Sequence, residues 1–276
     1  MPTRRRSQSG YSLIELMVAI VIGLFLIGGV LMIEQTVNLA HRDNDYLAQA
    51  DDDERFAVTL FTELGQRAGY YGDQTHNNIN TALPSVTITG TPDNATLSFQ
   101  AGESVYGTVD GSGNDGLAIR YMTRSDGSIP LCDGTAPTSS DVYVNYLYLS
   151  SAPGIPGLQT ANHYLDCVTY DVSTGVWGSP VELIDNVQNM YVYYGINTNN
   201  LVAGTDQDSY NVDTYVPTGS MTGTMSQYWT NVTALKAVFI IYNPLKYING
   251  QPQHGEPEHF QFTTVVALMN RTGPHS

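Results

Sequence analysis

The feature that most constrains this chain is an apolar run near its N-terminus, Leu16–Ile33, which contains no charged or strongly polar residue. A helix of about 20 such residues, at about 1.5 Å per residue, spans the hydrocarbon of a bilayer. Three arginines, Arg4–Arg6, precede the run. The positive-inside rule keeps that end in the cytoplasm and sends the C-terminal bulk across the membrane. The run is too long for a secretory signal, and no A-x-A cleavage pattern follows it.

A single carboxylate, Glu15, lies at the start of this run. An acidic residue within a membrane span costs roughly 2.5–3.5 kcal/mol on insertion scales. The simplest interpretation is a single-pass anchor in which the Glu15 side chain reaches the interface. A charge that is expensive in this position also invites a functional explanation.

The heptapeptide Gly10-Tyr11-Ser12-Leu13-Ile14-Glu15-Leu16, after its basic leader, resembles the type III signal of type IV pilins and type II secretion pseudopilins. The resemblance implies that a prepilin peptidase cuts after Gly10 and methylates the new N-terminus at Tyr11, where the family usually has Phe. It also implies a role in assembly for Glu15, the family's position-five glutamate. The amine freed by cleavage is cationic, and a neighbouring subunit's Glu15 can pair with it. Loss of one member of such a buried pair leaves a costly charge.

The charge balance of the chain disfavours binding to nucleic acid. The formal net charge is −15, and removal of the leader with its three arginines leaves 8 Lys+Arg against 26 Asp+Glu, or −18. Nucleic-acid binding needs clustered Lys and Arg, whereas the chain contains only two lysines, Lys236 and Lys246. We therefore expect no nucleic-acid partner.

The two cysteines, Cys132 and Cys167, are expected to form one disulfide if the body of the chain lies outside the cytoplasm. In the chain-entropy model a loop of about 35 residues contributes about 3–4 kcal/mol. Two free thiols or a metal pair are the alternatives, although the spacing matches no zinc pattern.

Hydrophobic periodicity predicts one long helix followed by many strands. Apolar residues from Leu39 to Ala68 recur mostly at helical spacings, Asp51–Glu54 marks a candidate break, and Gly69–Asp73 carries stop signals. From about residue 84 the period changes to two. The expected strands are Val86–Thr89, Leu97–Gln100, Leu117–Met122, Val142–Leu149, His163–Tyr170, Val187–Tyr194, Leu235–Tyr242 and Phe260–Leu268. Ala237–Ile241 is apolar on both faces, which predicts a central strand.

We therefore expect an α+β fold in which a long N-terminal α-helix packs on a C-terminal, mainly antiparallel β domain. The expected divisions are a cytoplasmic leader at 1–10, a helix at 11–70 and a periplasmic β-rich domain at 71–276. Residues 11–33 form the membrane-spanning or filament-core part of the helix.

Several stretches downstream look like the PilW-type minor pilins of type IV pili. They are Glu54–Ala57 with Arg67–Tyr70, Asn114–Tyr121, Val181–Met190 with Tyr194-Gly195, and Phe262–Arg271. The resemblance implies a minor pilin that moves from the inner membrane to the pilus tip and primes assembly with other minor pilins and the major pilin. A tip adhesin is a further implied partner. The alternatives are a J-like pseudopilin of type II secretion and a membrane-anchored binding domain that never polymerises.

The sequence offers no catalytic set and no cofactor motif. It contains no G-x-S-x-G elbow, P-loop or dinucleotide fingerprint, so we expect neither an enzyme nor a cofactor. His254–His259 gathers histidines and carboxylates, but its prolines favour a polar hairpin loop over a metal site. Asp206, Asp208 and Asp213 are calcium candidates, with a solvated turn as the simpler interpretation.

Overall fold

The computed structural model of the chain describes residues 12–72, 78–155, 157, 161–198, 211–243, 245–248, 251–253, 255 and 257–270. The chain divides into two compact units, Met1–Gln49 and Ala50–Ser276. Each unit is described by itself below.

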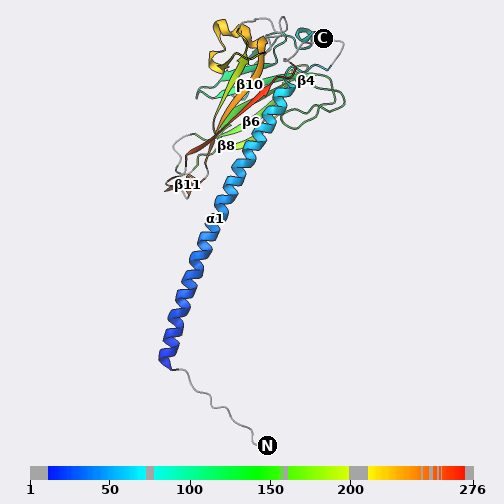
Figure 1. Cartoon of the computed structure of the whole chain (residues 1–276). Helices are drawn as coiled ribbons and strands as arrows, with labels where there is room; N and C mark the ends of the chain where they lie inside the picture. Colours follow the sequence, from blue (N-terminus) through cyan, green and yellow to red (C-terminus); the bar gives the residue numbers. More distant parts are fainter. Residues whose placement is uncertain are drawn as a thin grey trace, which may run out of the picture. The chain divides into compact units, whose positions relative to one another are not determined.

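Helix α1 (Leu13–Arg67) is a single element of 55 residues, and it continues through Asp51–Glu54 without the candidate break (Figure 1). It begins and ends close to the expected positions. Every described residue from Ser12 to Ile33 is exposed except Gly23, which is half-buried. The most apolar window has a mean hydropathy of 2.9. Among the described residues, α1 is the one helix long and apolar enough to cross a membrane.

The second unit is built on a nine-stranded antiparallel sheet with the order β13-β10-β8-β6-β5-β4-β3, in which β7 also pairs with β6 and β9 with β8. These strands are β3 (Val105–Val109), β4 (Asp115–Met122), β5 (Val142–Ser151), β6 (His163–Asp171), β7 (Val176–Trp177), β8 (Val181–Ile196), β9 (Thr214–Pro217), β10 (Val232–Tyr242) and β13 (His259–Ala267). The smaller elements are α2 (Ile79–Ala82), the hairpins β1 (Val86–Ile88) with β2 (Leu97–Phe99) and β11 (Tyr247–Ile248) with β12 (Gln251–Pro252), and the 3₁₀ helices η2 (Thr218–Ser220) and η3 (Gly223–Asn231).

The α+β fold and all eight expected strands are confirmed. Strand β10 has a neighbour on each side, as its apolar sequence predicts. Strand β8 is much longer than the expected Val187–Tyr194, since it begins at Val181. Its register shifts near Asn186, whose φ is 56°. A bulge of this kind breaks the alternation by which a strand is recognised in sequence.

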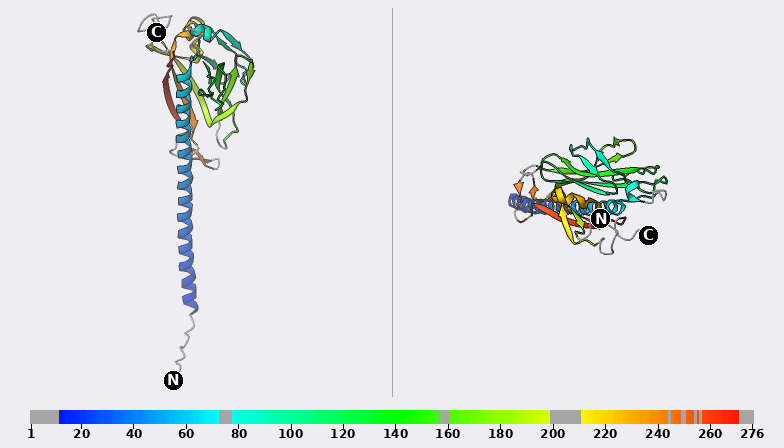
Figure 2. Two further views of the ribbon diagram at one scale, coloured as in Figure 1. Left: turned by 90° about the vertical axis from the view of Figure 1, so that its right-hand side faces the viewer. Right: turned by 90° about the horizontal axis from the view of Figure 1, so that it is seen from above.

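The main core lies between one face of the sheet and the last turns of α1, the cyan part of the helix in Figure 2. Ala57, Phe61 and Leu64 are each at most 1% exposed. The ring of Phe61 meets Phe239 edge-on at 6.3 Å, and Phe239 stacks on Phe262 at 5.0 Å. The compact unit that contains the sheet therefore includes the last turns of α1, from Ala50 onward.

A second, smaller core lies on the opposite face of β4, β5 and β6. The β1–β2 hairpin covers it with Ile88, Leu97 and Phe99, all at most 1% exposed. This part of the sheet is thus buried on both faces, which explains why every residue of β4 is buried.

Candidate functional site

The start of α1 has the geometry of a capping box. The Ser12 Oγ accepts a hydrogen bond from the amide of Ile14 at 3.3 Å, and Glu15 Oε2 accepts one from the amide of Ser12 at 3.0 Å. The two side chains satisfy amides that have no partner within the helix. The negative charge of Glu15 also lies at the positive end of the helix dipole.

Glu15 therefore has a local structural role besides any role in assembly. An N-terminal cap contributes about 1 kcal/mol to a helix. Both Glu15 and the apolar residues that follow it are exposed in the chain as it stands alone. Gly10 and Tyr11, the expected processing residues, lie outside the described residues.

At the other end of α1, hydrogen bonds connect the helix to residues from distant parts of the sequence. The Asn270 side-chain amide donates to the carbonyls of Gln66 at 3.1 Å and Ala68 at 3.2 Å. Gly69 has a φ of 73°, which favours glycine, and its amide donates to the carbonyl of Arg120 at 2.9 Å. We call these contacts the helix-end latch.

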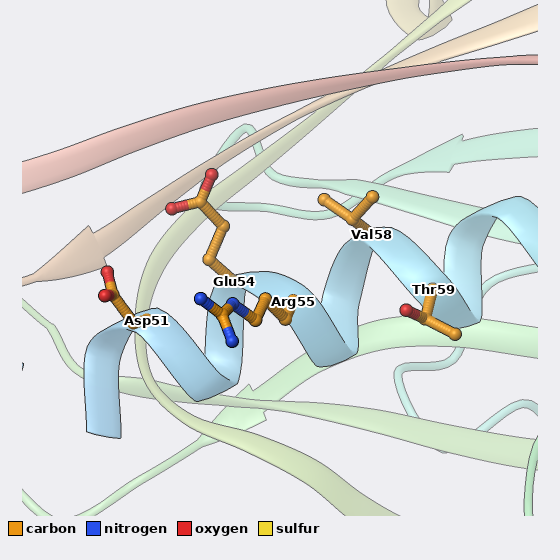
Figure 3. Close-up of a pocket in the computed structure, with 5 residues that line it drawn as sticks. All are labelled: Asp51, Glu54, Arg55, Val58 and Thr59. Atoms are coloured by element: carbon orange, nitrogen blue, oxygen red, sulfur yellow. The ribbon is translucent and has the colours of Figure 1, made fainter. Parts of the chain in front are cut away.

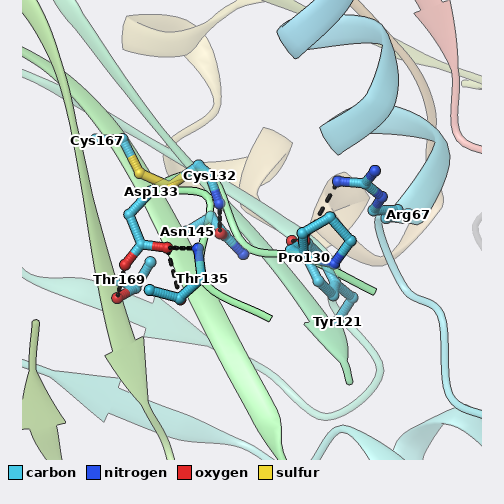
Figure 4. Close-up of a disulfide and its surroundings, with 9 residues drawn as sticks. All are labelled: Arg67, Tyr121, Pro130, Cys132, Asp133, Thr135, Asn145, Cys167 and Thr169. Carbon is cyan, nitrogen blue, oxygen red and sulfur yellow. Dashed lines mark hydrogen bonds between the residues drawn. A yellow bond between two sulfur atoms is a disulfide. The ribbon is translucent and has the colours of Figure 1, made fainter. Parts of the chain in front are cut away.

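The disulfide loop adds to the helix-end latch (Figure 4). The carbonyl of Pro130 accepts hydrogen bonds from the guanidinium of Arg67 at 3.3 Å and from the hydroxyl of Tyr121 at 2.9 Å. Burial raises the pKa of Tyr121 to about 12, against the opposing effect of the Arg67 charge, so the hydroxyl keeps its proton. Cys132, two residues after Pro130, forms a disulfide with Cys167 of β6.

The expected disulfide is confirmed between Cys132 and Cys167, with a Cα–Cα distance of 6.2 Å that lies within the usual range. The amide of Cys132 also donates to Oδ1 of the buried Asn145 at 2.8 Å. The loop is therefore held to the sheet by a covalent bond and by a hydrogen bond.

A buried cation, Arg120 of β4, organises the neighbouring loops. Its side chain is fully buried, and it donates to the carbonyls of Glu103 at 2.6 Å, Pro84 at 2.6 Å and Gln100 at 3.0 Å. Its guanidinium also lies 4.7 Å from the centre of the Phe99 ring. Carbonyl oxygens and an aromatic face suit a planar cation with five donors. Arg120 therefore ties the segments around residues 84 and 100–103 to the sheet.

Acidic residues gather on the part of α1 that belongs to the second unit. Burial, with Asp185 of β8 and Asp52 nearby, raises the pKa of Asp53 to about 6. Along the same helix turns, an open hollow is lined by Asp51, Glu54, Arg55, Val58 and Thr59 (Figure 3).

Of the three calcium candidates, the structure describes Asp213. Asp213 Oδ2 accepts hydrogen bonds from the amide of Thr198 at 3.0 Å and from its hydroxyl at 2.8 Å. Asp206 and Asp208 lie outside the described residues, as do His254 and Glu256. Among the residues described, no three His, Cys, Asp or Glu side chains are placed to hold a metal ion.

Comparison with known families gives two matches. A family model described as type IV pilus-assembly protein W matches residues 152–270, and one described as the prokaryotic N-terminal methylation motif matches residues 5–31. No curated protein and no solved structure matches the chain significantly. The first match spans β6 to β13 and ends at Asn270 of the helix-end latch, and the second spans the capped start of α1. Together with the long apolar helix and the antiparallel sheet, the two matches are consistent with a PilW-like type IV pilin.

Proposed function

We propose that this pilin is a minor pilin of a type IV pilus, acting in the tip complex that primes assembly. In this proposal the chain inserts into the inner membrane with its C-terminus in the periplasm. A prepilin peptidase cuts it after Gly10 and methylates Tyr11. It then joins other minor pilins and the major pilin in a filament whose tip can carry an adhesin.

The observation that carries this proposal is the placement of Glu15 at the capped start of an exposed apolar helix. The helix needs an apolar environment, which either a membrane or the core of a filament supplies. Within such a core the Glu15 carboxylate is favourable only beside a cation. The amine created at Tyr11 of a neighbouring subunit has the required charge.

Two further observations favour a pilus tip. The nine-stranded sheet makes the second unit bulky, and this bulk would crowd a regular shaft. The Cys132–Cys167 disulfide suits the periplasm and the cell surface. The match to pilus-assembly protein W supports a type IV pilus over a J-like pseudopilin of type II secretion.

A pair of substitutions at Glu15 separates the capping role from the proposed role of its charge. Glu15→Gln keeps a side chain suited to a capping box but removes the charge, whereas Glu15→Ala removes both. We expect both variants to insert into the membrane and both to be depleted from sheared pili in cells without the wild-type copy. Normal incorporation of Glu15→Gln would show that capping alone explains this residue.

Processing is tested separately by mass spectrometry of the N-terminus. The expected mature chain begins with an N-methylated Tyr11 in cells that contain the peptidase, and it keeps residues 1–10 in cells that lack it. A chain that keeps its leader in peptidase-positive cells, or that stays only in the inner membrane, would support the membrane-anchored binding domain instead.

A further inference from the structure

Strand β13 lies at one margin of the large sheet. It pairs with β10, and among the described residues no strand pairs with its other side. The register with β10 is unbroken from Ala234 opposite Ala267 to Tyr242 opposite His259. β13 is therefore a long and regular edge strand of nine residues.

The hydrogen bonds at both ends of β13 show which backbone groups face outward. The amide of Leu268 donates to the carbonyl of Thr233 at 2.8 Å, and the amide of Asn243 donates to the carbonyl of Glu258 at 3.0 Å. Since antiparallel pairs alternate between bonded and non-bonded positions, the even-numbered residues of β13 bond to β10. The odd-numbered residues direct their N–H and C=O groups away from the sheet. They are Gln261, Thr263, Val265 and Ala267, and all four are exposed.

This edge lacks the features by which proteins usually protect an exposed strand. Such features are prolines, charged side chains, bulges and short length, whereas His259–Ala267 contains no Pro, Lys, Arg, Asp or Glu. Val265, with its side chain on the solvent face, is 55% exposed. The opposite edge differs, because β3 has only five residues and lies against β2 and η2.

We propose that β13 is a docking edge to which an extended segment of another pilus subunit adds as a further strand. The inference rests on the proposed function, which places this chain among such subunits. The outward N–H and C=O groups of β13 can form hydrogen bonds with an extended backbone. The neighbouring Gln, Thr, Val and Ala side chains are uncharged and can pack against uncharged side chains of that segment. The incoming segment is therefore extended and uncharged, with alternating residues of high β propensity.

Charge argues against a second copy of this chain as the occupant. Each chain carries a net charge of −15, or −18 without its leader, so two copies repel each other at close range. A different subunit of lower negative charge avoids this repulsion.

The test places a photo-crosslinking amino acid at Val265 of the full-length chain in piliated cells. Val176 of β7 is the matched control, because it is a valine in a strand and is 61% exposed. We expect light to produce an adduct between position 265 and another pilus subunit, identified by mass spectrometry, with at least tenfold less adduct from position 176. Thr263→Pro, which removes an outward amide without touching the bonds to β10, should abolish the adduct.

Thr263→Lys provides a second block that places a charge on the exposed face, in case the proline variant does not fold. An intact Cys132–Cys167 disulfide on non-reducing gels reports folding of both variants. Equal adducts at 265 and 176, an adduct made of two copies of this chain, or an adduct that survives in a folded blocking variant would overturn the proposal. Failure of the proposed function is recognised separately, because the wild-type chain would then keep its leader or be missing from sheared pili.

Discussion

The contact between Gly65 of α1 and Val266 of β13 yields a quantitative prediction. A Cβ atom added at Gly65 would overlap with Cγ1 of Val266 and lie 3.0 Å from Cγ2 and 3.3 Å from Cβ of that residue. Both residues are buried in the main core. The helix therefore approaches the sheet so closely at this point that only a glycine fits without movement.

The expected effect of Gly65→Ala is the balance of two opposing contributions. Alanine favours the helix over glycine by about 0.8–1 kcal/mol, whereas overpacking a core costs about 1–3 kcal/mol. We expect a net loss of about 1 kcal/mol in the free energy of unfolding. Val266→Ala removes buried methyl groups and should cost about 2 kcal/mol.

The double substitution is the decisive measurement. In Gly65→Ala with Val266→Ala, the new methyl group occupies space that the valine has left, so the loss should be about 1 kcal/mol and not the sum of about 3 kcal/mol. Urea unfolding of the full-length chain in mild detergent, followed by fluorescence of the buried Trp229, measures these values. Gln66→Ala, at an exposed neighbouring position, is the control. Additivity within about 0.5 kcal/mol would refute the close contact.

Three further predictions concern the second unit. Asn270→Ala removes two hydrogen bonds to the end of α1 and should lower the free energy of unfolding by about 1–2 kcal/mol in the same assay. Replacing both Cys132 and Cys167 with serine should cost about 3–4 kcal/mol, and a reducing agent should lower the melting temperature of the wild type but not of this variant. Burial and the charge of Asp185 raise the pKa of Asp53 to about 6 in the folded protein. The folded state therefore binds the proton of Asp53 more tightly than the unfolded state does. The stabilisation that protonated Asp53 contributes is complete below about pH 4 and is lost as the pH rises through 6. Asp53→Asn should therefore add about 1 kcal/mol at pH 7.5, after discounting for solvent screening, and little at pH 4; an equal effect at both values would contradict this assignment.

The periodicity of the sequence predicted the element types well because most strands alternate regularly and α1 keeps a helical apolar pattern. Strand β3 escaped prediction, since Gly107 interrupts its alternation and weakens the strand signal. The first half of β8 escaped because of the bulge near Asn186. Such features depend on pairing with neighbours and leave only a faint local signal.

The roles of Arg120 and Asn270 could not be predicted from local sequence. Arginine is usually exposed, and Arg120 is buried only because carbonyls 17 to 37 residues away surround its guanidinium. Asn270 lies 204 residues from Gln66, whose carbonyl it binds. Both residues fall within stretches that resemble the PilW-type minor pilins, which was the available signal, but the resemblance gave them no physical role.

The structure supplies such a role, because three of the stretches that resemble this family meet at the end of α1. Arg67–Tyr70 ends the helix, Asn114–Tyr121 supplies the carbonyl that Gly69 binds, and Asn270 binds the helix carbonyls. In the proposed filament, a pull on the helix would load this junction, where the chain passes from helix to sheet. If the peptide bond alone joined the helix to the sheet, the helix could separate from the sheet under load. Here β4, the disulfide loop and the residues after β13 all contact the end of the helix, so these contacts must break together before the helix separates. The motifs are therefore explained as parts of one mechanical joint between the helix and the sheet.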